Sequence, residues 1–425
     1  MLQYINPARS EWASLIERNI PDDEHITRSV ADIIAAVRQE GDAALRRFAL
    51  EFDHTEISQL EVSEEEMAKA AELVSPQVKE AIAVAKDHIS RFHREQMPRT
   101  VDIETESGVR CCQRAVPIQR VGLYVPGGRA PLFSTVLMLA LPARIAGCPE
   151  IVLCTPQGAG GHIAPEILYA AQVCGVHHVF RVGGAQAVAA MAYGTESIPR
   201  VDKIFGPGNR FVTYAKQQVS RVCAIDMPAG PSEVLVMADA TANPAFVAAD
   251  MLSQAEHGPD SQAMLVCNDE AFAKKVEAEV KAQTARLSRA ELVEQSLSHS
   301  RILVFPSREE MCEFSNAYAP EHLIIQTERP WELAVKVTAA GSVFVGPYSP
   351  ESAGDYASGT NHTLPTGAWA RSFSGVNLDS YFRKITFQEL TREGLSSLAP
   401  TIVAMAEAEG LQAHAEAVRV RTQNN

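Results

Sequence analysis

The middle of the chain alternates short apolar runs with longer stretches in which apolar residues recur at helical spacing. Strands are expected at residues 120–125, 150–154, 178–182 and 203–205, and helices at 133–146, 164–174, from 184 to about 193, and after residue 209. Strands that alternate with helices form parallel sheets joined by right-handed crossovers. Residues 121–234 are therefore expected to form one α/β domain.

A second series of the same kind follows, and helical patterns lie on either side of the two series. Strands are expected at 233–238, 263–267, 301–305, 323–326 and 342–345, and helices at 24–53 and 63–93. Ser63 and Glu66 have the spacing of a capping box, which satisfies free N–H groups in the first turn of a helix. From about Val376 the pattern is helical again, and Thr386 and Glu389 form a second capping box.

The fold class expected from these patterns is α/β, with two incomplete Rossmann-like parallel-sheet domains, one inserted in the other. Residues 24–120 and 235–375 would form a discontinuous domain that carries the chemistry, and 121–234 the inserted domain. Residues 1–23 would be an N-terminal arm and 376–425 a helical C-terminal segment. At 425 residues the chain is too long for one ordinary core, which favours two domains and a cleft between them.

Charge and hydropathy exclude several classes of partner. The net charge is −14, and Lys and Arg are scattered, so the sequence offers no basic face for nucleic acid or an anionic membrane. The longest apolar run, residues 133–141, ends at Pro142 and is too short for a membrane span. Residues 1–6 do not resemble the start of a signal peptide, so we expect a cytoplasmic protein acting on small molecules.

The eight cysteines match neither a disulfide scaffold nor a Cys-x-x-Cys metal site, so we expect them to be reduced. Cys148 and Cys154 lie near glycine-rich turns, and aldehyde oxidation often uses a cysteine nucleophile. The alternative is that both are small buried apolar residues, because neither has a neighbouring His or cation in sequence to lower its pKa.

Glycine turns follow several predicted strands of the 121–234 domain, at 126–128, 183–186 and 206–209. A glycine turn between strand and helix lets backbone N–H groups approach a phosphate. None of these turns has the Gly-x-Gly-x-x-Gly fingerprint, and glycines also occur at such turns for backbone reasons alone. The sequence by itself therefore leaves dinucleotide binding open.

Three segments carry candidate metal ligands and proton-transfer groups. Gln254 and His257 are three residues apart on a probable helix that Gly258 would end, so they share a face. Glu321 and His322 are adjacent, and Asp355 lies in a glycine-containing segment. Catalytic zinc sites take His and carboxylate ligands from separate segments, although Gln is an unusual ligand. Each residue also has an ordinary interpretation: His257 as a helix-capping or core histidine, and Asp355 as a turn residue.

Several long motifs together resemble the histidinol dehydrogenase family, in order and nearly from end to end of the chain. They are Leu252-Ser253-Gln254-Ala255-Glu256-His257-Gly258-Pro259-Asp260-Ser261-Gln262, Gly206-Pro207-Gly208-Asn209, Ala229-Gly230-Pro231-Ser232-Glu233, Pro320-Glu321-His322-Leu323 and Ser352-Ala353-Gly354-Asp355-Tyr356. The resemblance implies a zinc-dependent homodimer that oxidises L-histidinol to L-histidine with two NAD⁺, the last two steps of histidine biosynthesis.

Carried over residue by residue, the resemblance assigns roles. Those implied are zinc ligation by Gln254, His257, Asp355 and His414, acid–base chemistry by Glu321 and His322, substrate contact by Ser232, His362, Glu409, His322 and the metal ligands, and NAD contact by Tyr124, Gln186 and Asn209. Without the family, His414 would be taken for a solvated surface histidine. The resemblance also implies that the C-terminal segment completes the active site of the other subunit.

Three alternatives remain. A paralogue could oxidise another polar alcohol to its acid with the same zinc and NAD. A zinc hydrolase could use Glu321 to activate water without a nicotinamide, and a binding protein would have no catalytic use for the Glu321-His322 pair. Consecutive strand residues point to opposite faces, so both members of that pair can serve one substrate only if residues 320–322 form a turn.

Overall fold

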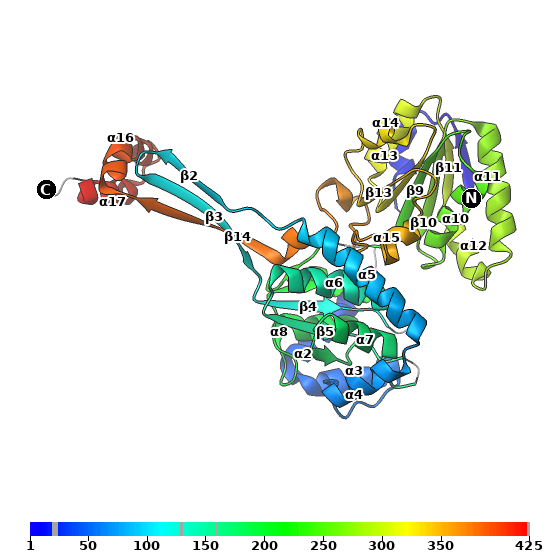
Figure 1. The fold of residues 1–425 in the computed structure, drawn as a ribbon, viewed down its shortest axis with the longest axis horizontal. Helices are drawn as coiled ribbons and strands as arrows, with labels where there is room; N and C mark the ends of the chain where they lie inside the picture. The colour runs from blue at the N-terminus through cyan, green and yellow to red at the C-terminus, as the bar shows by residue number, and fades with distance from the viewer. Residues whose placement is uncertain (19–23, 128–130, 159, 229, 423–425) are drawn as a thin grey trace.

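The chain forms two parallel-sheet α/β domains and a projecting arm (Figure 1). This computed structural model describes residues 1–18, 24–127, 131–158, 160–228 and 230–422. The end of the 126–128 glycine turn, the end of the expected 1–23 arm, Ala229 of one motif and the last three residues of the chain lie outside the described residues. The predicted α/β class with two parallel sheets is confirmed.

The first domain is built on a five-stranded parallel sheet with the strand order β6-β5-β4-β7-β8. Its strands are β4 (Arg120–Tyr124), β5 (Glu150–Cys154), β6 (His178–Phe180), β7 (Lys203–Phe205) and β8 (Ala224–Ile225). The helices that connect them are α6 (Phe133–Ala146), α7 (Pro165–Val173), α8 (Gly184–Tyr193) and α9 (Arg210–Val219). The chain builds β4, β5 and β6 in one direction and then returns to the other side of β4 for β7, so the strand order reverses between β4 and β7.

The N-terminal helices belong to this first domain, which differs from the division expected from the sequence. They are α2 (Glu24–Glu40), α3 (Asp42–Asp53), α4 (Glu64–Leu73) and α5 (Pro76–Arg94). Helices α2 and α3 share a core with α8 and α9 on one face of the five-stranded sheet, and α4 and α5 share a core with α6 and α7 on the other. Each of these helices has one apolar face, and a single sequence does not tell which sheet that face will meet.

The second domain is built on a six-stranded parallel sheet with the order β1-β11-β10-β9-β12-β13. Its strands are β1 (Leu2–Ile5), β9 (Glu233–Ala238), β10 (Gln262–Cys267), β11 (Arg301–Val304), β12 (His322–Gln326) and β13 (Ser342–Val345). Its helices are α1 (Trp12–Leu15), α10 (Pro244–Ala255), α11 (Glu270–Thr284), α12 (Ala290–His299), α13 (Arg308–Tyr318), α14 (Pro330–Ala334) and α15 (Glu351–Tyr356). Because β1 pairs with β11, the start of the chain is an edge strand of this sheet, not a separate arm.

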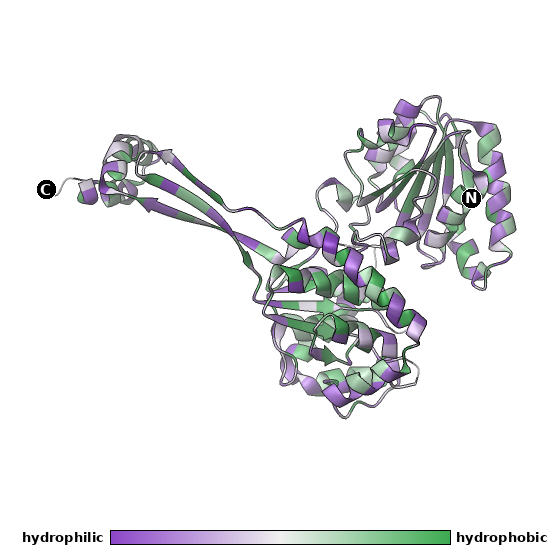
Figure 2. Cartoon of the chain, in the orientation of Figure 1, coloured by the Kyte–Doolittle hydropathy of each residue, from purple (hydrophilic) through white to green (hydrophobic). Residues whose placement is uncertain are grey.

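Hydrophobic residues are concentrated in the strands of the two parallel sheets, and hydrophilic residues on the outer helices (Figure 2). Every residue of β9 and β10 is buried, as expected for strands covered on both faces. Among the described residues, no helix combines the length and the apolar character needed to cross a bilayer.

The arm is an antiparallel three-stranded sheet that ends in two helices and extends away from both domains (Figure 1). It contains β2 (Val101–Glu106), β3 (Val109–Pro117), β14 (Phe382–Leu390), α16 (Arg392–Ala408) and α17 (Gln412–Thr422). The expectation of helix from Val376 is therefore wrong for residues 382–390, and so is the Thr386–Glu389 capping box. Thr386 pairs with Gln113 of β3, and Thr391 caps α16 by accepting a hydrogen bond from the N–H of Gly394 at 3.1 Å.

Between the second domain and the arm, the chain passes once more over the first domain. There the ring of Tyr381 stacks on Phe205 of β7 with centroids 4.2 Å apart, and its hydroxyl donates to the carbonyl of Leu139 at 2.9 Å. This packing anchors the arm on the five-stranded domain. Strand β2 follows α5, β3 leads into β4, and β14 begins directly after Tyr381.

Candidate functional site

The end of α10 places the first two candidate residues. Asn243 caps the start of this helix, and the helix ends at Ala255. Gln254 lies in the last turn and is fully buried. His257 lies just beyond the helix rather than in its last turn, and its N–H donates to the carbonyl of Gln254 at 3.2 Å. This hydrogen bond holds the backbone of His257 close to the end of the helix.

Glu321 and His322 meet at the amino end of β12. Glu321 occupies a bend before the strand and His322 is its first residue, so the turn required at 320–322 is present. His322 Nδ1 lies 3.6 Å from Glu321 Oε2. That carboxylate accepts a hydrogen bond at 2.8 Å from the N–H of Glu233, the first residue of the neighbouring strand β9. Both side chains therefore serve the same small volume.

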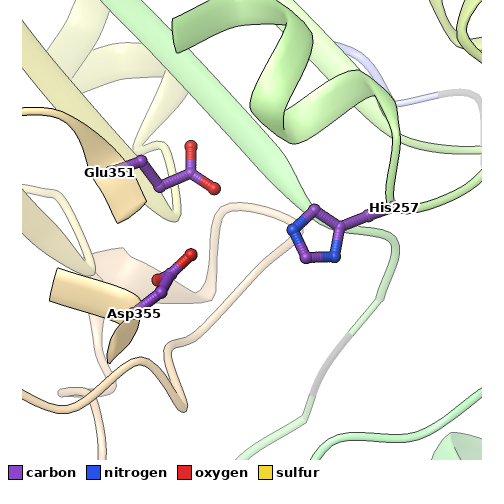
Figure 3. Close-up of side chains that lie close together, drawn as sticks. All are labelled: His257, Glu351 and Asp355. Carbon is purple, nitrogen blue, oxygen red and sulfur yellow. The ribbon is translucent and has the colours of Figure 1, made fainter. Parts of the chain in front are cut away.

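Asp355 joins this group from the short helix α15, together with a residue that the sequence analysis missed. Asp355 Oδ1 lies 3.8 Å from His322 Nε2. Glu351 is the first residue of α15, four before Asp355, and is only 1 % exposed. One ligand atom each of His257, Glu351 and Asp355 lies within 4.8 Å of the others, which is close enough for one metal ion. Figure 3 shows both carboxylates directed from α15 toward the imidazole of His257.

Gln254 also contacts Glu351. With its amide oriented so that donors face acceptors, the nitrogen of Gln254 lies 2.8 and 3.1 Å from the two carboxylate oxygens of Glu351. This orientation follows from the hydrogen-bond network, since nitrogen and oxygen are otherwise alike in shape. The carbonyl oxygen of Gln254 is then turned away from Glu351.

The site carries an excess of carboxylates. Burial alone would lower the pKa of His322, but the charges of Glu351, Glu321 and Asp355 raise it to about 10. Burial raises the pKa of Glu321 to about 8, against the opposing effects of His322 and the Glu233 N–H. Burial also raises the pKa of Glu351. Three acidic side chains around one imidazole are the charge arrangement that a divalent cation would balance.

Ser232 and His362 are placed near this group by neighbouring residues. Ser232 directly precedes β9, next to the residue whose N–H holds Glu321. His362 follows Asn361, whose side-chain amide donates to the carbonyl of Met138 in α6 at 2.6 Å. His362 therefore lies where the second domain meets the first. Burial would raise the pKa of Asp355, but the nearby His322 lowers it, and the charge of His362 adds a smaller lowering.

The three candidate NAD contacts lie at the carboxyl ends of the strands of the five-stranded sheet. Tyr124 ends β4, and its hydroxyl accepts a hydrogen bond at 3.2 Å from the N–H of Gly184, the first residue of α8. Gln186 lies in the same first turn of α8 and is buried. Asn209 caps α9 after β7, accepting from the N–H of Val212 at 3.1 Å. These positions flank the reversal of strand order between β4 and β7, where open α/β sheets bind ligands.

The Gly206 turn between β7 and α9 needs a residue without a side chain. Gly206 has φ +129°, and a Cβ there would lie 2.1 Å from the carbonyl oxygen of Tyr124. One residue after Asn209, Arg210 forms an ion pair with Asp260 at 2.9 Å. Since Asp260 is three residues after His257, this pair connects the candidate NAD edge of the first domain to the candidate metal loop of the second.

Glu409 and His414 do not join the other candidates within this chain. Glu409 caps the end of α16 and His414 lies in α17, at the outer end of the arm. Both are exposed. Figure 1 shows these helices far from α10 and α15. Within the described residues of one chain, the site therefore contains Gln254, His257, Glu321, His322 and Asp355, but neither His414 nor Glu409.

The sequence analysis also missed a buried support behind the acid–base pair. The guanidinium of Arg18 donates two hydrogen bonds of 2.9 Å to the carboxylate of Glu233 and lies 3.7 Å from the ring centroid of Tyr318. No short-range signal marks this pair, because its members are 215 positions apart.

The eight cysteines are all free, as expected. Burial raises the pKa of Cys148 to about 11, and it raises the pKa of Cys154 still further. Both are buried among apolar residues, which supports the interpretation of these two cysteines as core residues and leaves no thiolate nucleophile at those positions.

Comparison with known proteins identifies the family to which this architecture belongs. The family model "Histidinol dehydrogenase" matches residues 16–422. The chain belongs to the histidinol dehydrogenase family. It is 55 % identical over 416 residues to the histidinol dehydrogenase of Bacteroides thetaiotaomicron, covering 98 % of this chain and 97 % of that one. It is also 55 % identical over 417 residues to the Escherichia coli K12 enzyme, covering 97 % and 95 %.

A solved histidinol dehydrogenase has the same fold. The crystal structure of the enzyme from Elizabethkingia anophelis superposes with a TM-score of 0.97 at 50 % identity, covering 100 % of this chain and 98 % of that one. Membership of the family makes this chain an NAD-dependent oxidoreductase and argues against the hydrolase and the binding protein considered as alternatives.

Proposed function

We propose that this enzyme oxidises L-histidinol through L-histidinaldehyde to L-histidine with Zn²⁺ and two molecules of NAD⁺, the last two steps of histidine biosynthesis. The observation that carries the proposal is the meeting of Glu321 and His322 with Gln254, His257 and Asp355 at one end of the six-stranded sheet. Such a group combines proton-transfer residues with metal ligands, as a metal-assisted alcohol dehydrogenase requires.

His322 is oriented for proton transfer through Nε2. Its Nδ1 lies 3.2 Å from the carbonyl oxygen of Glu233 and 3.3 Å from the amide nitrogen of Gln254. We assign an Nδ1–H that donates to Glu233, with both amide hydrogens of Gln254 directed at Glu351. The buried Nε2 has no hydrogen-bond partner in the described structure. When the charge of the surrounding carboxylates is balanced by another cation, the imidazole becomes neutral, and Nε2 can accept the alcohol proton as hydride leaves the carbinol carbon.

Glu321 is suited to the second oxidation. Burial raises its pKa to about 8 without a cation, and the cation that neutralises His322 would bring the pKa of Glu321 down toward neutrality, where a general base combines a useful deprotonated fraction with proton affinity. We assign to it removal of a proton from the water that adds to the bound aldehyde. The hydrate then gives up the second hydride, so water supplies the new oxygen of the carboxylate.

The side chains present fit Zn²⁺. His257 and Asp355 offer a nitrogen and an oxygen on the two sides of the site, and the carbonyl of Gln254 is left free when its amide nitrogen faces Glu351. Zinc, when bound, supplies a positive charge and a fixed point of attachment for the amino and imidazole nitrogens of the substrate. Ser232 and His362 flank the remaining space and would contact the substrate.

The five-stranded domain is the proposed NAD⁺ site. NAD⁺, when bound, accepts the hydride. Tyr124, Gln186 and Asn209 would contact it at the reversal of strand order, and the Gly206 turn brings backbone close to that crevice. The ion pair between Arg210 and Asp260 supports closeness of this crevice to the metal loop.

The proposed enzyme is a homodimer with shared active sites. Two observations support this assembly: Glu409 and His414 lie at the end of a projecting arm, and the arm exposes apolar side chains. Val101, Ile103 and Phe387 are about half exposed, at 48, 52 and 47 %. Val101 and Ile103 share one face of the arm sheet, whereas Phe387 lies on the other, because it is in register with Cys112 and Asp102. Apolar side chains exposed on both faces of this sheet support a contact with another chain. In the dimer, His414 would be the fourth zinc ligand, and Glu409 would contact the substrate, both in the partner's site.

The cytoplasmic location expected from the sequence is also part of the proposal. The test of the activity is NADH formation from L-histidinol by the purified protein. We expect two NADH per histidinol, loss of turnover after treatment with a chelator, and recovery on addition of Zn²⁺. Turnover of other polar alcohols but not of histidinol, or failure to restore growth of a histidine auxotroph, would favour the paralogue instead.

A further inference from the structure

Glu351 is buried at the proposed metal site, yet the proposed reaction leaves it without a role. It is 1 % exposed, and its carboxylate is in contact with the amide nitrogen of Gln254 at 2.8 and 3.1 Å. It shares one face of α15 with Asp355, four residues later, so one short helix supplies both carboxylates.

The amide of Gln254 can bind a metal in only one of its two orientations. A carboxamide can bind a metal through its oxygen but not through its nitrogen, which is a donor with no available lone pair. The two ends of the amide have nearly the same shape, so packing alone does not select which end faces the ion. A neighbouring acceptor does select it, because a carboxylate attracts the N–H₂ group and repels the carbonyl oxygen.

We propose that Glu351 is a positioning residue, which holds the amide nitrogen of Gln254 and thereby presents its carbonyl oxygen to the metal. The inference rests on the proposed function, since it requires that the protein binds a divalent cation here. Metal-ligating side chains usually have such outer partners, and removal of one commonly weakens metal binding about 10–100-fold. Glu351 would explain how a glutamine serves in a ligand set that otherwise contains histidines and a carboxylate.

Two substitutions of Glu351 separate its hydrogen bond from its charge. Glu351→Gln and Glu351→Met both remove the charge in a side chain of similar length. Only Gln retains an oxygen that can accept from the Gln254 amide. The measurement is the Zn²⁺ dissociation constant of the full-length protein, obtained by competition with a chromogenic chelator, with the melting temperature of the metal-free protein as a check on folding.

We expect Glu351→Met to weaken Zn²⁺ binding about 100-fold and Glu351→Gln about 10-fold. In a Gln254→Ala background the amide is absent, so the two variants should agree within about threefold, because coupled residues are non-additive. Equal affinities of the two variants in the wild-type background would overturn the inference, since charge alone would then account for the loss.

The same comparison tests direct ligation by Glu351. If its oxygen bound the metal, Gln would remain better than Met in the Gln254→Ala background, and the positioning role would be wrong. If one variant of Glu351 does not fold, the Zn²⁺ affinity of the other in the two backgrounds still tests the inference. Substitution of a positioning residue weakens Zn²⁺ binding only in the background that contains Gln254. Absence of Zn²⁺ binding by the wild-type protein would instead refute the proposed function itself.

Discussion

Arg18 is expected to stabilise the second domain through its buried ion pair with Glu233. The Arg18 side chain is 11 % exposed and that of Glu233 only 2 %, and two hydrogen bonds of 2.9 Å join them. In Arg18→Met the carboxylate of Glu233 would keep only the N–H of Gly367, at 2.9 Å, as an identified donor to its side chain. The substitution therefore leaves a buried charge without its counter-charge.

The expected loss follows from the burial of the pair. Removing one partner of a buried ion pair typically costs about 3–5 kcal/mol, because the remaining charge is left uncompensated. For a domain of this size, each kcal/mol lowers the melting temperature by about 2–4 °C, so we expect a fall of about 10 °C. Glu233 also donates its N–H to Glu321, so the turnover of Arg18→Met should fall even at temperatures where the protein remains folded.

Differential scanning calorimetry of the full-length protein at pH 7 measures the effect. Arg329→Met is the matched control, because Arg329 pairs with Glu332 at 2.8 Å where the two side chains are 67 and 52 % exposed. An exposed pair contributes less than about 1 kcal/mol, so the control should hardly shift. Arg18→Lys should fall between the two, since lysine keeps the charge but not the paired geometry. If Arg18→Met melted within about 2 °C of Arg329→Met, the reasoning from burial would be refuted.

Four further predictions follow from the described contacts. Gly206→Ala should destabilise the first domain by roughly 1–3 kcal/mol or more and weaken NADH binding in a fluorescence titration, because its backbone is left-handed and its Cβ would meet Tyr124, whereas Gly160→Ala, with nothing within 4 Å, should do neither. Burial would raise the pKa of Asp239, but hydrogen bonds from Thr241 and Glu328 and the charge of Arg308 lower it below 3.8, so Asp239→Asn should be less stable than wild type at pH 5–7. That gap should close as the pH falls below 3.8 through the folded-state pKa, and a gap that widened there would contradict the sign. Mixing inactive Gln254→Ala and His414→Ala proteins under subunit exchange should restore about a quarter of wild-type activity, since about half the dimers are mixed and each has one intact site, while no recovery in verified mixed dimers would exclude shared sites. Glu321→Gln should slow histidinaldehyde oxidation roughly 10²–10⁴-fold and spare more of the alcohol step, and equal losses in both half-reactions would reject the assigned roles.

The repeating strands and helices could be predicted from the sequence because each is marked by local periodicity. The expected strands at 150–154 and 203–205 coincide with β5 and β7, and the expected helix at 133–146 coincides with α6. The arm was missed although β2 begins with an apolar–polar alternation, from Val101 to Glu104. All six residues of β2 are exposed, so this short alternation does not correspond to a buried face within the chain.

The site could be predicted where the signal lies in contiguous motifs, and not where it depends on packing. The resemblance named Gln254, His257 and Asp355, and the structure brings these three together around His322. Arg18 could not be found, because its partner is distant in sequence. Glu351 could have been found, since a second carboxylate four residues before Asp355 shares its helix face.

The pairing of β1 with β11 affects the order in which this chain can fold during synthesis. Leu2 is aligned with Arg301, so β1 has no place in its sheet until about 300 further residues have been made. Nearly all of the five-stranded domain is made in between, and domains generally fold as units from the N-terminus. Strand β1 therefore remains unpaired while the five-stranded domain folds. The entropic cost of closing a loop rises only slowly with its length, but pairing between strands so far apart in sequence is slow. We therefore expect the six-stranded sheet to form after the five-stranded one.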